Sequence, residues 1–96
     1  MRDLTELRTE IDRIDKQLTA LFEERMDTIL EIAEYKTQHN LPILNTGREQ
    51  EVIESCIECL HNRAYEKQLA QWMQQTMTLS KEIQKEYIAS LQAEES

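Results

Sequence analysis

The stretch from Leu4 to Tyr35, LTELRTEIDRIDKQLTALFEERMDTILEIAEY, contains no Gly or Pro and repeats apolar residues at steps of three and four. This spacing is typical of an α-helix with one apolar face. The positions on that face are Leu4, Leu7, Ile11, Ile14, Leu18, Leu21, Arg25, Thr28, Ile32 and Tyr35. Arg25 therefore stands where a Leu is expected. A guanidinium on an apolar face is unfavourable unless it is paired, so we expect an acidic side chain or an anionic ligand beside it. The other interpretation is an arginine that reaches past the edge of a helix pair into water.

The length of this helix predicts a dimer. A helix from Leu4 to about His39 is roughly 54 Å long at 1.5 Å per residue. A compact domain of this size has a radius of gyration of only about 12 to 13 Å. The helix therefore extends beyond any globule that its own chain can form, and its apolar face needs a second chain. We predict a homodimer in which the long helices of two subunits pack together.

Composition predicts an all-α chain of one domain, residues 1–96. A single Gly and a single Pro leave little material for turns or strands. The formal net charge of −8 argues against a nucleic-acid partner. No stretch approaches the apolar length of a membrane span, and the polar N-terminus predicts no signal peptide.

Local signals set the ends of the first helix. Asp3 or Thr5 can cap its N-terminus, and Glu6 strengthens its first turn. The helix is expected to end by Asn40, because the residue before Pro42 disfavours helical geometry. Turn-forming residues follow, so we predict a loop over about 40–47.

Two further helices are expected. The first covers about Arg48 to His61, and its apolar face consists of Val52, Ile53, Cys56, Ile57 and Leu60. A weaker break covers Asn62 to Glu66. The last helix covers about Glu66 to Leu91, and the tail from Ala93 to Ser96 is expected to fray.

The apolar face of the last helix becomes polar at Ser80 and Gln84. Its earlier members are Leu69, Trp72, Met73, Thr76 and Met77, and it continues with Ile83 and either Gln84 or Tyr87. Ser80 and Gln84 lie one turn apart and share a face. Two interpretations are open: a polar pocket between helices, or a partly exposed helix edge, which is the commoner arrangement for such spacing.

Cys56 and Cys59 form a Cys-x-x-Cys sequence with His61 nearby. As a metal site this group supplies at most three ligands, and as a redox motif it lacks the strand that thioredoxin-like chemistry uses. We interpret both as structural thiols and expect no metal site. The absence of other cysteines fits a reducing cytoplasm.

The candidate site residues are the cationic and polar side chains on the helix faces: Arg8, Arg25, Lys36, Arg48, Glu49, Ser80 and Gln84. Arg25 and Lys36 are three turns apart, about 16 Å along one face, so both can reach a small ligand between them. Arg8 precedes Arg25 by about 25 Å and cannot serve the same pocket from the same chain. In an antiparallel pair of long helices, Arg8 of one subunit can reach the site of the other.

A pocket with several cations, one carboxylate and neutral donors suits a small polyanion that carries a hydroxyl group. No Ser-His-Asp arrangement, Cys-His arrangement or Gly-rich phosphate loop is visible in the sequence. Such a pocket can hold a flexible dianion in a reactive shape and stabilise the charge of its transition state. This is sufficient for a unimolecular rearrangement.

These residues, taken in order, resemble the all-helical chorismate mutases over almost the whole chain. The matching sequences are Leu7-Arg8-x-x-Ile11-Asp12-x-Ile14-Asp15, Glu24-Arg25, Lys36, Arg48-Glu49 and Ser80-x-x-x-Gln84. The resemblance implies a Claisen rearrangement of chorismate to prephenate, on the path to phenylalanine and tyrosine, without a cofactor. It also implies an intertwined dimer of three-helix chains.

The resemblance further implies a role for each site residue. Arg25 and Arg8 of the partner subunit would hold the two carboxylates of chorismate, assisted by Arg48 and Ser80. Lys36 and Gln84 would donate hydrogen bonds to the ether oxygen. Glu49 would accept a hydrogen bond from the ring hydroxyl.

Asn45 is a departure, since members of the family often carry Asp there. A contribution through its backbone N–H leaves the site unchanged, whereas loss of a carboxylate weakens the hydroxyl contact. Isochorismate pyruvate lyases share the fold and the cationic pocket, but the adjacent Arg48 and Glu49 favour the mutase. A third interpretation is a helical dimerisation module without catalysis, in which Arg25, Lys36 and Gln84 are dispensable.

Overall fold

The computed structural model describes residues 1–43 and 46–95, and this part of the chain contains three α-helices, one short 3-10 helix and no strand. The α-helices are α1 (Leu4–Gln38), α2 (Thr46–Glu58) and α3 (Glu66–Glu95), and the 3-10 helix η1 (Arg63–Tyr65) precedes α3. The all-α class expected from the sequence is confirmed.

Helix α1 begins and ends close to the predicted positions. The Asp3 carboxylate accepts a hydrogen bond from the backbone N–H of Glu6 at 2.9 Å and caps the first turn. At the other end Asn40 adopts a positive φ of 56°, and the N–H of Leu41 donates to the carbonyl of Lys36 at 2.8 Å. Asn tolerates this left-handed geometry, which closes the last turn.

Helix α2 differs from the prediction at both ends, because it begins at Thr46 instead of Arg48 and ends at Glu58 instead of His61. Thr46 and Gly47, which were predicted to belong to the loop, lie in the first turn of the helix. At the far end the N–H groups of Cys59 and Leu60 donate to carbonyls three residues back, which tightens and ends the helix.

Helix α3 begins at Glu66 as predicted but continues to Glu95, so the expected fraying from Ala93 onward is wrong for the described residues. The segment Leu91-Gln92-Ala93-Glu94-Glu95 contains only residues of good helix propensity and no breaker. Trp72 is a second difference: it was predicted to lie on the apolar face of this helix, but it is 51% exposed in the single chain.

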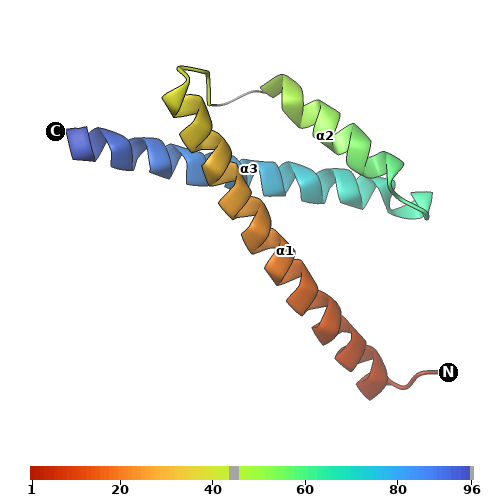
Figure 1. Cartoon of the computed structure of the whole chain (residues 1–96). Coiled ribbons are helices and arrows are strands. Elements are labelled where there is room, and N and C mark those ends of the chain that lie inside the picture. Colours follow the sequence, from red (N-terminus) through yellow and green to blue (C-terminus); the bar gives the residue numbers. More distant parts are fainter. Residues whose placement is uncertain (44–45, 96) are drawn as a thin grey trace.

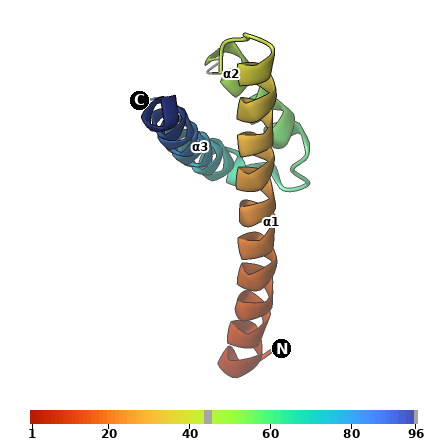
Figure 2. The ribbon, with the colours of Figure 1, turned by 60° about the vertical axis from the view of Figure 1, so that its left-hand side comes forward.

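The three helices meet around the middle of α3. Figures 1 and 2 show α2 lying alongside the N-terminal half of α3, while α1 crosses α3 with its C-terminal half. Ile53 of α2 forms a small core with Met73 and Met77 of α3, and Cys56 packs against this core. Helix α1 contributes the buried side chains of Met26 and Ala33.

The rest of α1 projects from this junction. Both views show residues 4–20, which we call the projecting segment, extending away from α2 and α3 (Figures 1 and 2). The molecule measures 61 × 26 × 16 Å, and its radius of gyration of 17.3 Å exceeds the value of about 12.5 Å for a compact chain of this length. Leu4, Leu7, Ile11 and Leu18 of this segment are 41–61% exposed. An apolar helix face is therefore uncovered within the single chain.

None of the described helices is long and apolar enough to cross a membrane.

Candidate active site

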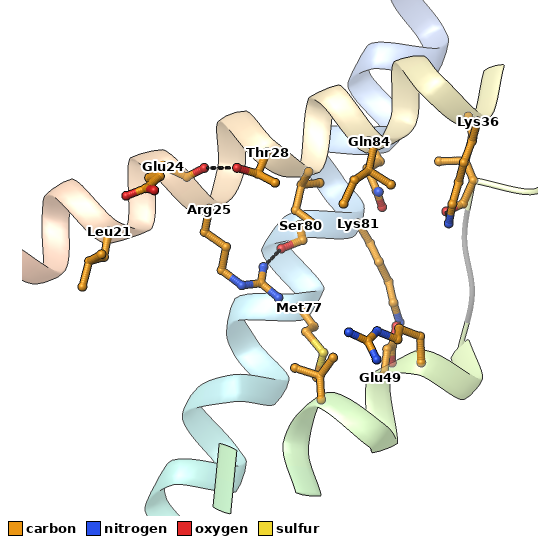
Figure 3. Close-up of a pocket in the computed structure, with 15 residues that line it drawn as sticks. Leu21, Glu24, Arg25, Thr28, Lys36, Glu49, Met77, Ser80, Lys81 and Gln84 are labelled. Carbon is orange, nitrogen blue, oxygen red and sulfur yellow. Dashed lines mark hydrogen bonds and ion pairs between the residues drawn. The ribbon is translucent and has the colours of Figure 1, made fainter. Parts of the chain in front are cut away.

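A pocket of about 700 Å³ lies where the C-terminal half of α1 meets α2 and α3 (Figure 3). Its polar lining residues are Glu24, Arg25, Thr28, Lys36, Arg48, Glu49, Ser80, Lys81 and Gln84. Apolar side chains complete the wall: Leu21, Ile29, Ile32, Ile43, Val52 and Met77. A concave site of this size with an apolar wall and a few converging polar groups is typical of small-molecule binding.

Arg25 points from α1 across to α3. Its Nη1 atom donates a hydrogen bond of 2.6 Å to Oγ of Ser80, as Figure 3 shows. Ser80 is 4% exposed, and its hydroxyl donates to the backbone carbonyl of Thr76 at 2.9 Å. In the described part of the chain no carboxylate forms an ion pair with Arg25. The protein partner of Arg25 is thus a neutral hydroxyl, which leaves most of the five guanidinium N–H donors for a ligand.

Gln84 lies one turn beyond Ser80 and is 7% exposed. Among the described residues its amide has no hydrogen-bond partner. Every fully buried polar side-chain atom has a partner, so the amide atoms of Gln84 are not fully buried. The amide therefore faces the pocket, where a ligand or water can satisfy it. The partly exposed helix edge, which the spacing alone favoured, is wrong for both Ser80 and Gln84, and the polar pocket is confirmed.

Lys36 enters from the last turn of α1, at the opposite end of the pocket from Leu21 (Figure 3). Its Nζ atom donates to the backbone carbonyl of Ile43 at 3.3 Å. This contact fixes the ammonium at the pocket wall and uses one of its three donors. The remaining donors can reach an oxygen of a bound ligand.

Glu49 lies on α2 and forms an ion pair with Lys81 of α3. The two side chains are 20% and 31% exposed, so water screens the pair only in part. Arg48, next to Glu49, is more exposed and forms an ion pair with Glu51 at 3.3 Å. Glu49 is thus already paired with a cation of its own chain.

The charges around the pocket are strongly asymmetric. Four basic side chains, Arg25, Lys36, Arg48 and Lys81, face two carboxylates, Glu24 and Glu49, which leaves a formal charge of +2 among the described lining residues. The whole chain carries −8. Clustered cations in a cleft focus the field locally, so this pocket favours a dianion in spite of the average charge.

Six of the eight predicted site residues line this one pocket: Arg25, Lys36, Arg48, Glu49, Ser80 and Gln84. Arg8 does not line it, because it lies on the projecting segment. Asn45 lies outside the described residues.

The resolved pKa shifts in the described chain lie outside the pocket. Arg13 hydrogen-bonds to the carboxylate of Glu10, with 2.6 Å between Nη2 and Oε1, and this contact lowers the pKa of Glu10 and raises the pKa of Arg13. Both residues belong to the projecting segment. The pair links neighbouring turns of α1. It does not indicate a reactive group.

The thiols of Cys56 and Cys59 are both free. Cys56 packs against the core of α2 and α3, and Cys59 is exposed. Within the described residues no three metal-ligating side chains cluster together.

Residues 7–85 match the family model for chorismate mutase type II, which is most of the chain. The chain belongs to the chorismate mutase type II family. The matched residues include Arg8 and every polar residue of the pocket.

The curated relatives that match this chain are longer proteins. It is 44% identical over 57 residues to a bifunctional chorismate mutase/prephenate dehydratase of Aquifex aeolicus, which covers 59% of this chain and 16% of the relative. It is 41% identical over 49 residues to the T-protein of Haemophilus influenzae, which covers 51% of this chain and 13% of the relative. The chain thus spans about a sixth or less of the length of these relatives. No solved structure matches the chain.

Lys81 was not among the site residues predicted from the sequence. Lys81 lies four residues after Met77 and three before Gln84, so helical spacing places it on the same side of α3. That spacing was a usable signal. Its pairing with Glu49 depends on how α2 packs against α3, which no local pattern encodes.

Proposed function

We propose that this chain is a chorismate mutase that converts chorismate to prephenate, on the path to phenylalanine and tyrosine. The observation that carries the proposal is the formal charge of +2 around a pocket of suitable size, in a chain of the matching family. Chorismate carries two carboxylates, an ether oxygen and a ring hydroxyl. The pocket offers a complementary side chain to one carboxylate (Arg25), to the ether oxygen (Lys36 and Gln84) and to the hydroxyl (Glu49).

The proposed roles follow the chemistry of those side chains. Arg25 binds one carboxylate, and Arg8 of the partner subunit binds the other, with Arg48 and Ser80 at the wall. The support for Arg25 is its guanidinium, which has only a hydroxyl partner among the described residues and so retains donors for an anion. Glu49 accepts a hydrogen bond from the ring hydroxyl.

Lys36 and Gln84 donate hydrogen bonds to the ether oxygen of chorismate. Negative charge builds on this oxygen as its bond to the ring breaks. Donors fixed before the reaction stabilise this charge more than they stabilise the ground state, which lowers the barrier. The buried and unpaired amide of Gln84 supports this role. The proposed rearrangement needs no cofactor and no covalent intermediate, because the pocket acts by holding the substrate folded.

We propose that the working form is a homodimer in which the projecting segments pack against the partner. The exposed apolar side chains of residues 4–20 support it, since burying each one contributes about 1.5 to 3 kcal/mol. The segment also carries Arg8, which the pocket of its own chain does not contain. We further propose that residues 1–96 form one chorismate mutase domain and that the chain is cytoplasmic, which its two free thiols support.

Ile11→Asp is expected to break the dimer. A carboxylate on the apolar face of the projecting segment should weaken association at least about tenfold and lower activity with it. Analytical ultracentrifugation over a concentration series measures the change. Thr9→Asp places the same charge on the opposite face of the helix and should leave the dimer intact. A wild-type chain that remains folded and fully active as a monomer at low concentration would contradict the dimer.

The test of the activity is the loss of chorismate absorbance on addition of the chain, with the product identified. We expect prephenate. Release of pyruvate would instead indicate a lyase of the same fold. Absence of any reaction, from a chain shown to be folded and dimeric, would support a dimerisation module and overturn the proposed function.

A further inference from the structure

The ion pair between Lys81 and Glu49 differs from the other ion pairs of the described chain. Those of Arg13, Arg48 and Arg63 join residues three positions apart on one helical turn, and their arginine side chains are 55–69% exposed. Lys81 and Glu49 come from different helices and are mostly buried. Figure 3 shows the Lys81 side chain extended from α3 to Glu49 on α2. An ion pair of this kind fixes the geometry of the pocket wall.

The pair also determines which part of Glu49 a ligand meets. Nζ of Lys81 contacts Oε1, so the carboxylate is held through one oxygen and Oε2 remains available as an acceptor. Without Lys81, this long side chain would sample several rotamers at the pocket wall. Holding an acceptor in one orientation lowers the entropy that a ligand must remove on binding.

The electrostatic effect acts in the same direction. Without Lys81, the Glu49 carboxylate would be an unpaired negative charge beside a dianionic ligand. Like charges that line one pocket repel each other strongly where water is partly excluded. Lys81 neutralises that charge while leaving the hydrogen-bond acceptor in place. The pocket keeps its +2 balance only with Lys81 present.

We propose that Lys81 is a positioning residue for Glu49: it orients and neutralises this carboxylate so that Glu49 can accept the hydroxyl hydrogen bond of a dianionic substrate. The inference rests on the proposed function, in which that substrate is chorismate. In this role Lys81 acts on the substrate through Glu49.

The experiment is a double-mutant cycle on the full chain. We measure kcat/KM for chorismate in wild type, Lys81→Met, Glu49→Gln and the double variant. Lys81→Met should lower kcat/KM about tenfold, because it leaves a partly buried carboxylate unpaired. The kcat/KM of the double variant should be no lower than that of the less active single variant. Removing both charges restores the +2 balance, and without the Glu49 carboxylate the loss of Lys81 has no further effect.

Two further variants separate positioning from stability. Lys81→Arg keeps a cation beside Glu49 and should retain kcat/KM within about threefold of wild type. Lys85→Met makes the same substitution at an exposed site one turn along α3 and should change nothing. Thermal unfolding monitored for every variant confirms that the differences arise in folded protein.

The outcomes distinguish the two proposals. If wild type is active and the single effects multiply in the double variant, Lys81 acts independently of Glu49 and this inference is overturned while the proposed function stands. If Lys85→Met lowers kcat/KM as much as Lys81→Met does, the effect arises from surface charge in general and the positioning role is overturned. If wild type does not convert chorismate, the proposed function fails and this inference fails with it.

Discussion

Arg8→Ala and Arg25→Ala chains, each inactive alone, are expected to regain about a quarter of wild-type activity when they are mixed in equal amounts and refolded together. Each homodimer lacks one carboxylate-binding arginine in both sites, which should lower kcat/KM by about three orders of magnitude. Random pairing makes half of all dimers in the mixture heterodimers. One site in each heterodimer combines Arg25 of one chain with Arg8 of the other and is intact. Steady-state rates at equal total concentration measure the recovery.

A second mixture provides the control. A chain with both substitutions, refolded with an equal amount of wild type, should leave about a quarter of the activity if sites are shared between subunits and about half if each chain works alone. A mixture of the two single variants that forms heterodimers but stays inactive would place Arg8 outside the partner's site.

The second large effect is expected from Gln84→Glu. Near pH 7.5 the introduced carboxylate should lower kcat/KM by about three orders of magnitude, because it repels the negative charge that develops on the ether oxygen instead of donating to it. As the pH falls toward the pKa of this carboxyl, its protonated form becomes a donor and activity should return. The buried position acts to raise that pKa above the usual range for Glu.

The pH–rate profile between about pH 4.5 and 8 is the measurement. Wild type should show no gain on the acid side, since a glutamine amide does not titrate in this range. Gln74→Glu, at an exposed site on the same helix, should follow wild type. Parallel profiles for Gln84→Glu and wild type, with both proteins folded, would remove Gln84 from the ether oxygen.

The sequence predicted those features that depend on neighbours along the chain. The period of the apolar residues located α1, and Asp3 and Asn40 marked its ends because capping and left-handed geometry are local preferences. Part of the pocket could also be predicted, since Arg25 and Lys36 lie on one face of one helix. The ends of α2 were less predictable, because Gly47 is compatible with both a turn and the first turn of a helix.

Contacts between helices could not be read from the sequence. Arg25 was expected to meet an acidic side chain or an anionic ligand, and its protein partner among the described residues is the neutral hydroxyl of Ser80, which lies 55 residues away. The burial of Gln84 and the pairing of Lys81 with Glu49 depend in the same way on how α1 and α2 pack on α3. Helical spacing shows which residues share a face, but the neighbour of that face is a property of the tertiary structure.

The projecting segment links helix formation to the amount of protein in solution. Residues 4–20 gain no packing from α2 or α3, and helices in water derive most of their stability from such packing. Their hydrogen-bonded turns are held only from one end, at the junction near Met26, so the helix–coil equilibrium favours unwinding from Leu4 inward. If a second chain covers the apolar face, it supplies the missing packing by mass action. The length of α1 is then set by the concentration of the chain as well as by its sequence.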